Sequence, residues 1–360
     1  MPALASQLYT FDPRPRYPLR LSAARYWDPS SETHDDPTAP TLVFTHATGA
    51  HKEQYEPTIQ DLYNYNLAGP KTKIREVWTI DAPDHGDSAV LNEEALRDGG
   101  RAYHPVFGWD EYARGLHAFL AGLGTGVDVD FSKRRLVLIG HSSGAVVVGM
   151  CLIRQSTASS LALTYQPELK PEFLIMIEIM GMNTEVCAKM REILTKGSAN
   201  RRDIWPSRAE AYRLFTARAA YREWDDRVLR IFVEKGLRPL PTLEYPDKDK
   251  EGVTLKCTRK QETATYRDNL ASPAVYTLMR FIVQRFQTHF IDGTVDNYLS
   301  RAVKDDFLEN AVGGMQNLAS FSHVSGAGHL VAQTHPTGLA KALLDVLTKE
   351  ERGRKMHTKL

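Results

Sequence analysis

The sequence has little cysteine and no long apolar segment, and both absences narrow the class of protein. Its 360 residues include three cysteines, Cys151, Cys187 and Cys257, which are far apart and odd in number. That number and spacing exclude a disulfide framework and match no zinc-binding pattern. The longest apolar run, residues 174–182, contains Glu178 and is far shorter than the roughly 18 residues of a membrane-spanning helix. We therefore expect an intracellular protein of a reducing compartment, without a transmembrane segment, a bound metal or a cofactor.

An excess of charge of either sign is also missing. The chain has 45 basic and 44 acidic side chains and a formal charge of +1, so it has no general attraction to nucleic acid and none is expected as a partner. The first sixteen residues lack the apolar stretch of a secretory signal,. The content of 42% hydrophobic and 25% charged residues is typical of a folded globular chain.

Short apolar runs alternate with helical patterns along most of the chain. Such runs are typical of buried parallel strands, and their alternation with helices predicts an α/β fold with a mostly parallel sheet. The strand-like runs are 41–45, 74–81, 135–140, 174–178, 286–291 and 319–324. Helices are expected at 109–123, 143–154 and 336–347.

The pattern changes between residues 184 and 269. Arginines become dense there, and apolar residues recur at helical spacing, for example Tyr212, Phe215 and Ala219,. We expect a mainly helical cap over 184–269, inserted into a core that consists of residues 1–183 and 270–360.

The strongest functional signal is Gly140-His-Ser-Ser-Gly144, which stands between the strand-like run 135–140 and a helical segment. In a G-x-S-x-G turn the serine is lifted to the carboxyl edge of the sheet, and the next helix directs backbone N–H groups at developing negative charge. This context predicts that Ser142 is a nucleophile and that Ser143 provides one oxyanion N–H group.

A second oxyanion donor is expected from the loop after the first buried strand, Thr45-His-Ala-Thr-Gly49,. Its small residues allow a close approach to substrate. The backbone N–H of Thr48 or of its neighbour Ala47 is the candidate.

The general base is expected in the segment Gly326-Ala-Gly-His329, which follows a late strand and precedes the last helix. A histidine at that place can return to the serine. His323 lies within a strand pattern and His335 precedes a proline, so both are weaker candidates than His329.

Two carboxylates compete for the acid of the triad. Asp296 follows the late strand in Gly293-Thr-Val-Asp296, and Glu178 ends the strand after the nucleophile. Both satisfy the chain order serine, acid, histidine. The sequence favours Asp296 and leaves Glu178 open, whereas Asp292 lies within the strand and is less favoured.

These motifs together resemble the α/β-hydrolase superfamily. They stand in the order of that family as HATG (46–49), DAPDHGDS (81–88), GHSSG (140–144), GTVD (293–296) and GAGH (326–329). Ala47 and Asp84 stand where the family's patterns have glycine. More narrowly, the cap and residues 252–266 resemble fungal peroxisomal hydrolases, a group with a peroxisomal lipase, toxin-biosynthesis hydrolases and an acyl-CoA hydrolase of mycophenolic acid biosynthesis. In the last branch the acid follows the strand after the nucleophile, which keeps Glu178 open.

The resemblance implies a serine hydrolase that acts on an ester or thioester of a hydrophobic acyl group, such as an acyl-CoA, a polyketide thioester or a lipid ester, in fungal secondary metabolism. One alternative is a thioesterase that releases its chain by cyclisation or transfer to an alcohol, and another is a non-catalytic binding protein. His46, His141, Trp205 and Phe215 are the expected substrate contacts. The cap arginines either grip a CoA phosphate or a carboxylate, or pair with acidic residues on helix faces.

The last three residues, Thr358-Lys-Leu360, resemble the S-K-L peroxisomal address with threonine in its first position,. The expected location is therefore the peroxisome or the cytoplasm, with a peroxisomal import receptor as one expected partner. A homodimer is the other assembly that we consider.

Overall fold

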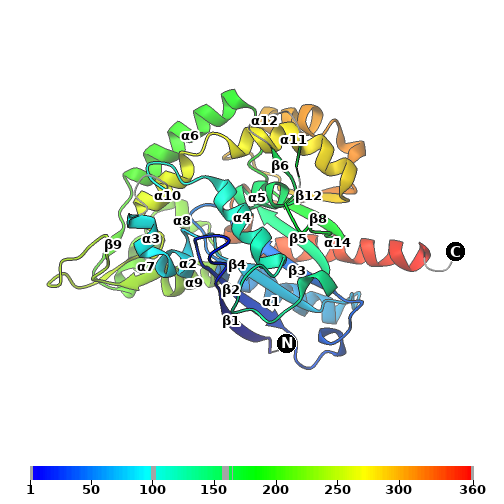
Figure 1. The fold of residues 1–360 in the computed structure, drawn as a ribbon, viewed down its shortest axis with the longest axis horizontal. Coiled ribbons are helices and arrows are strands. Elements are labelled where there is room, and N and C mark those ends of the chain that lie inside the picture. The colour runs from blue at the N-terminus through cyan, green and yellow to red at the C-terminus, as the bar shows by residue number, and fades with distance from the viewer. Residues whose placement is uncertain (1–2, 99–102, 156–161, 164, 358–360) are drawn as a thin grey trace.

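In the computed structural model, which describes residues 3–98, 103–155, 162–163 and 165–357, an eight-stranded sheet runs through the molecule (Figure 1). Its order is β1-β2-β4-β3-β5-β8-β12-β13. The strands are β1 (Ala5–Phe11), β2 (Leu21–Trp27), β3 (Pro40–Thr45), β4 (Glu76–Ile80), β5 (Arg135–His141), β8 (Phe173–Ile177), β12 (Thr288–Gly293) and β13 (Ser320–Val324). The strands from β4 to β13 pair in parallel, and β1 and β2 pair antiparallel at one edge. The predicted α/β class is confirmed.

The six predicted strands are present, with ends that differ by one or two residues. The inner strands β3, β4 and β8 are buried along their whole length, which is why they appear as unbroken apolar runs. The hairpin of β1 and β2 has no such signature. Four residues of β1 are exposed, so its pattern is that of a half-solvated edge strand.

Helices cover both faces of the sheet, and the sheet separates two hydrophobic cores. One face carries α4 (Trp109–Leu120), α5 (Ser143–Leu152) and α11 (Ala271–Arg285), and the other carries α1 (Glu56–Ala68) and α14 (Pro336–His357) (Figure 1). Alternation along β5 sends Leu138 into the first core and its neighbours Val137 and Ile139 into the second,.

The other elements outside the cap are short. They are α2 (Gly86–Leu91), α3 (Glu93–Asp98), α12 (Arg301–Asp306), α13 (Val331–Thr334), the pair β6 (Arg154–Gln155) and β7 (Ala162–Leu163), the 3-10 turns Glu32–His34, Lys52–Tyr55, Phe131–Lys133 and Met315–Asn317, and the π turn Phe307–Ala311. None of the helices within the described ranges is both long and apolar enough to cross a bilayer.

The segment 184–269 lies between β8 and α11 and carries its own elements. They are α6 (Thr184–Ala199), β9 (Ile204–Trp205), α7 (Arg208–Thr216), α8 (Ala219–Arg222), α9 (Asp226–Gly236), β10 (Leu237–Pro239), β11 (Val253–Leu255) and α10 (Arg259–Tyr266). Most of these elements are helices, and β10, β11 and β9 form a small antiparallel sheet. Strands of two or three residues are too short to leave a periodic pattern, so the sequence does not predict them. Figure 1 shows α7, α9 and β9 at one end of the molecule, with α10 near them and α6 leading from there along the upper edge of the view. We refer to this segment as the cap.

Candidate active site

Ser142 occupies a strained turn between β5 and α5. Its backbone has φ 58° and ψ −120°, a conformation that non-glycine residues rarely adopt. A Cβ atom on Gly140 would lie 2.4 Å from Ala145 Cα, and one on Gly144 would lie 2.5 Å from the carbonyl oxygen of Thr45. The two glycines therefore allow the close contacts of the turn, as the G-x-S-x-G pattern predicts.

His329 lies beside this serine, in the loop between β13 and α13. Its Nε2 is 2.8 Å from Ser142 Oγ. Two contacts hold the main chain of the histidine: His141 Nε2 donates to its carbonyl oxygen at 2.7 Å, and its N–H donates to Asn297 Oδ1 at 2.9 Å. The ring of Tyr298 stacks on the imidazole with centroids 5.1 Å apart. The sequence patterns do not indicate Asn297 or Tyr298, because neither stands in a motif.

Glu178 reaches the other nitrogen of that imidazole. Glu178 Oε2 lies 3.2 Å from His329 Nδ1, while Oε1 accepts the N–H of Gly293 at 2.6 Å and the ammonium of Lys304 at 2.7 Å. Burial alone would raise the pKa of Glu178, but the hydrogen bond from His329 and the charge of Lys304 lower it to about 2,. The residue also has a positive φ of 44°, and such strain is common at functional sites.

Asp296, the acid that the sequence favours, is turned elsewhere. Its two carboxylate oxygens each accept a hydrogen bond from Arg301 at 3.1 Å, and Lys304 Nζ is 3.5 Å away. The geometry therefore disagrees with the ranking of Asp296 above Glu178. Asp292 is buried in β12 with Lys304 Nζ at 4.0 Å, and burial and the charge of Glu178 raise its pKa to about 7. Lys304, which connects these carboxylates, stands in no motif and could not be found from the sequence.

The two expected oxyanion segments lie against each other. We call residues 46–49 the oxyanion loop. The N–H and the hydroxyl of Thr48 both donate to Ser143 Oγ at 2.9 Å. Ser143 is the first residue of α5, and N–H groups of a first turn have no acceptor within their own helix. Ala47 accepts the N–H of Ala50 at 3.0 Å, which closes the turn of the loop.

The expected substrate contacts of the two histidines are replaced by structural ones. His46 is buried: its Nε2 accepts the N–H of Ala82 at 2.9 Å, and its Nδ1 donates to the carbonyl oxygen of Ala47 at 2.8 Å. His141 is fully buried below His329, and burial together with the charge of His329 lowers its pKa to about 4. The His46 ring thus supports the oxyanion loop, and the His141 ring supports the loop of His329, from inside the protein.

The two cap aromatics also differ from the expectation. Trp205 and Phe215 are 2% and 3% exposed, and their ring centroids lie 5.1 Å apart inside the hydrophobic cluster of the cap. Each ring is surrounded by cap residues such as Leu229 and Phe232. Burial in that cluster explains their apolar character without a substrate.

Several cap arginines form ion pairs. Within the cap, Arg213 pairs with Glu210, Arg230 with Asp226, and Arg201 with Glu262. Arg227 joins the cap to the core through a bidentate contact with Asp61 at 3.0 Å. These contacts favour the interpretation that the cap arginines pair with acidic residues on helix faces. Glu262 is also close to the site, because its Oε1 would lie 2.8 Å from a Cβ atom on Gly49.

The residues that the structure describes include no group of three histidine, cysteine, aspartate or glutamate side chains that could hold a metal ion. At the edge of the sheet, a hydroxyl, an imidazole and a carboxylate lie in hydrogen-bonded order, next to two loops that carry N–H donors. A site of this kind, at the carboxyl ends of parallel strands, suits acyl transfer.

Comparison with known proteins identifies the class. Residues 42–342 match the Alpha/beta hydrolase family, and the chain belongs to that family. Among curated proteins it is similar to the type I acyl-CoA thioesterase mpaH of Penicillium brevicompactum, with 27% identity over 269 residues. The aligned part is 74% of this chain and 55% of that protein, so the chain spans about half the length of the curated relatives it matches.

Solved structures agree on the fold. The peroxisomal alpha-beta-hydrolase Lpx1 of Saccharomyces cerevisiae superposes with a TM-score of 0.64 at 20% identity, covering 96% of this chain and 88% of that one. A thioesterase domain from the curacin biosynthetic pathway superposes with a TM-score of 0.58 at 13% identity, covering 96% and 99%. The predicted α/β-hydrolase resemblance is confirmed.

Proposed function

We propose that the chain is a serine hydrolase that cleaves ester or thioester bonds through an acyl-enzyme on Ser142. The observation that carries the proposal is the hydrogen-bonded series at the edge of the sheet. Ser142 Oγ is 2.8 Å from His329 Nε2, and His329 Nδ1 is 3.2 Å from Glu178 Oε2. The same order of groups supports nucleophilic acyl transfer on unrelated folds.

In the proposed reaction, His329 takes the proton of Ser142 while the serine oxygen attacks the carbonyl carbon. The N–H of Ser143 and the N–H of Thr48, which exchanges its contact with Ser143 Oγ for the substrate oxygen, stabilise the negative charge on the tetrahedral intermediate. Each such donor lowers the barrier by about 3 kcal/mol. His329 then returns the proton to the leaving alcohol or thiol. A water molecule, activated by the same imidazole, hydrolyses the acyl-enzyme and regenerates Ser142.

Glu178 is the proposed acid of the triad. It fixes the His329 tautomer with the proton on Nδ1 and stabilises the imidazolium that forms during attack. Its position supports this role more than that of Asp296, whose oxygens are bound to Arg301. Asp296 has the proposed role of a structural partner in the loop after β12.

The proposed substrates are esters or thioesters of a hydrophobic acyl group, with an acyl-CoA first among them. The curated relatives of the chain are named acyl-CoA thioesterases, which supports this order. A role in fungal secondary metabolism is the wider proposal. The expected import through Thr358-Lys-Leu360, which lies outside the described residues, and the expected homodimer stay predictions.

A serine-directed fluorophosphonate probe tests the chemistry. We expect rapid covalent labelling of the wild-type chain and no labelling of Ser142→Ala, with both proteins folded by circular dichroism. A folded wild-type protein that stays unlabelled and inactive on esters would overturn the proposal and favour the non-catalytic alternative.

A panel of acyl-CoA thioesters and p-nitrophenyl esters of matched chain length tests the substrate class. Higher kcat/KM on the thioesters, with the free acid as product, supports an acyl-CoA hydrolase. A preference for the oxygen esters would point to a lipid ester instead, and a lactone or a new ester as product would indicate cyclisation or transfer.

A further inference from the structure

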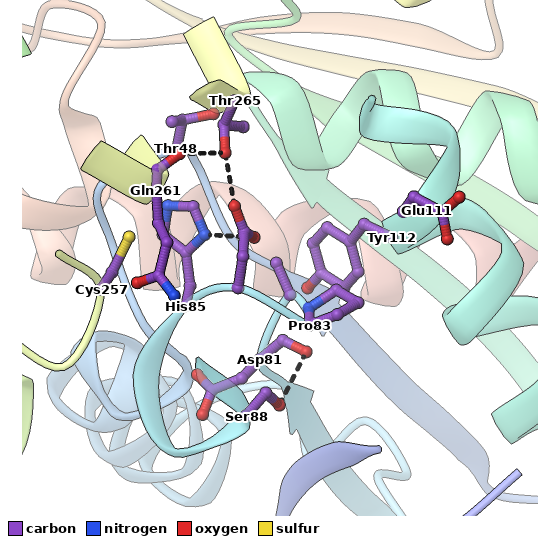
Figure 2. Close-up of polar contacts among 12 residues, drawn as sticks. Thr48, Asp81, Pro83, His85, Ser88, Glu111, Tyr112, Cys257, Gln261 and Thr265 are labelled. Atoms are coloured by element: carbon purple, nitrogen blue, oxygen red, sulfur yellow. Dashed lines mark hydrogen bonds and ion pairs between the residues drawn. The ribbon is translucent and has the colours of Figure 1, made fainter. Parts of the chain in front are cut away.

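A chain of hydrogen bonds, of which the last is partly buried and the others are buried, connects the cap to the oxyanion loop without passing through the triad. It begins at Thr265 of α10, whose hydroxyl donates to Asp84 Oδ2 at 2.5 Å. Asp84 Oδ1 accepts the Nδ1–H of His85 at 2.7 Å, and His85 Nε2 accepts the N–H of Gly49 at 2.9 Å. Figure 2 shows Thr265 and His85 at the two ends of this arrangement, with Thr48 beside them.

The last contact requires a neutral imidazole. A backbone N–H can only donate, so when Nε2 of His85 accepts the bond from Gly49, the single ring proton lies on Nδ1, facing Asp84,. Burial lowers the pKa of His85, but the charge of Asp84 raises it well above its usual value, and a doubly protonated ring could not accept this bond. His85 and Asp84 are each only 1% exposed. In such surroundings water does not compete for these contacts, and each link holds the orientation of the next.

The link to the cap depends on a residue that departs from the family pattern. Asp84 stands where the D-x-P-G-H-G-x-S stretch has glycine, and a glycine has no side-chain oxygen for Thr265 or for His85. The next residue of α10, Tyr266, also contacts the loop, through a hydroxyl 3.4 Å from the carbonyl oxygen of Thr48. Two consecutive residues of one cap helix thus contact the oxyanion loop, one directly and one through Asp84.

Cys257 lies beside His85 (Figure 2), so the cluster contains a thiol, an imidazole and a carboxylate. It is nonetheless a poor second nucleophilic site. Burial raises the pKa of the Cys257 thiol and disfavours the thiolate, and Nε2 of His85, which would accept the thiol proton, already accepts the N–H of Gly49. The geometry suits holding the loop rather than reacting.

We propose that Thr265, Asp84 and His85 are positioning residues, which hold the oxyanion loop in its reactive geometry and make that geometry depend on the seating of α10. The proposal rests on the proposed function. Gly49 has φ 81°, and its N–H belongs to the peptide unit next to the one that carries the Thr48 N–H. A rotation that released the Gly49 N–H from His85 would therefore turn the Thr48 N–H away from the carbonyl oxygen of the substrate.

Thr265→Val removes the hydroxyl at nearly constant volume and tests the link. With p-nitrophenyl butyrate as substrate, we expect kcat to fall about tenfold with KM within about twofold, because the loss falls on the transition state. The inhibition constant of phenylboronate, a tetrahedral mimic, should rise by a similar factor. Thr265→Ser should recover most of the activity. If Thr265→Val does not fold, Thr265→Ala replaces it with the same expectations.

Thr263→Val is the matched control. Thr263 lies on the same helix, is also buried, and its hydroxyl bonds to Ser198 at 2.8 Å within the cap. It should lower the melting temperature by a similar amount without changing kcat or the phenylboronate constant. Equal effects of the two variants on kcat would overturn the proposal, because both would then act only through the stability of the cap.

A double-variant cycle tests transmission through His85. His85→Leu removes the acceptor of the Gly49 N–H, and we expect about a 100-fold loss of kcat. Adding Thr265→Val should cause no further loss, since the link is already broken, whereas additive losses would overturn the proposal. If the wild type hydrolyses the ester through Ser142 and Thr265→Val leaves kcat unchanged, the positioning role is refuted but the proposed function is not. Absence of that hydrolysis in the wild type refutes the proposed function itself.

Discussion

Two buried lysines, Lys304 and Lys52, each gather three carboxylates, and only one of these clusters contacts the proposed base. Lys304 Nζ lies 2.7 Å from Glu178, 3.5 Å from Asp296 and 4.0 Å from Asp292. Lys52 Nζ lies 2.6 Å from Glu53, 2.7 Å from Asp87 and 2.9 Å from Asp81. The two clusters therefore have almost the same charged groups at the same edge of the protein core.

The difference lies in what the carboxylate oxygens face. In the Lys52 cluster, both oxygens of Asp81 accept backbone N–H groups, from Lys52 at 2.8 Å and from Asp87 at 2.9 Å, so the cluster fixes main chain. In the Lys304 cluster, Glu178 binds Lys304 and a backbone N–H with one oxygen and turns the other to His329. In the Lys52 cluster, Glu53 Oε2 likewise lies 2.8 Å from a histidine, His51. The proposed catalytic cluster is therefore distinguished by its histidine, which contacts Ser142 as well as Glu178 Oε2.

The largest expected effect comes from changing that oxygen. We expect Glu178→Gln to lower kcat by about 10³–10⁴-fold, because a neutral amide no longer fixes the tautomer or stabilises the imidazolium. Asp296→Asn, with a carboxylate of the same cluster, should change kcat by less than about threefold. Steady-state kinetics of both variants decide the matter. Equal and mild losses would contradict the assignment of the acid.

Replacement of the two lysines should affect stability and kcat differently. We expect Lys52→Met to lower the free energy of unfolding by about 3–5 kcal/mol, because it leaves buried carboxylates without their cation, while kcat per folded molecule stays within about threefold. Lys304→Met should also lower kcat by at least about tenfold, since Glu178 Oε1 loses a partner and the carboxylate reorients. Urea unfolding and active-site titration with a fluorophosphonate separate the two quantities.

The contrary result would be a Lys52→Met variant that is stable but inactive. Lys52 would then influence catalysis, and the distinction between the clusters would fail.

The sequence predicts Ser142 and His329 well because each stands in a local motif next to a strand. The core strands are equally visible, since burial on both faces leaves an unbroken apolar run. The acid is different. A carboxylate at a strand end satisfies the chemical pattern whether it faces an imidazole or an arginine, and Arg301, which binds Asp296, lies on another element. Lys304 is 126 residues from Glu178, so this contact exists only in the folded chain.

A change of pH should alter the stability that a carboxylate of each cluster contributes, in opposite directions for the two clusters. Burial and the charge of Glu178 raise the pKa of Asp292 to about 7. Its stabilising effect is therefore present below its unfolded pKa of about 3.9 and is lost as the pH rises through 7. Asp292→Asn should raise the melting temperature at pH 8 and change it much less at pH 5. Thermal unfolding across this range measures the effect.

Asp87 provides the opposite case in the Lys52 cluster. Despite its partial burial, Lys52 and Lys256 lower its pKa, so its contribution is present above about pH 3.9 and is lost in acid. Asp87→Asn should lower the melting temperature at pH 7 and have less effect at pH 3. A loss of stability in Asp292→Asn at pH 8 would contradict the comparison.

The smallest expected effect tests whether Asp296 is excluded from catalysis by its partner alone. Arg301→Gln removes the bidentate contact of Asp296, and the arginine side chain is 44% exposed. Exposed ion pairs contribute about 0–1 kcal/mol to stability, so the free energy of unfolding should change by less than about 1 kcal/mol. Because Glu178 still occupies the Nδ1 side of His329, kcat should stay within about twofold. The sharpest readout is Arg301→Gln combined with Glu178→Gln. If Asp296, once released, restored part of the lost activity, the two carboxylates would be interchangeable, and the choice between them would depend on Arg301 rather than on the strained backbone of Glu178.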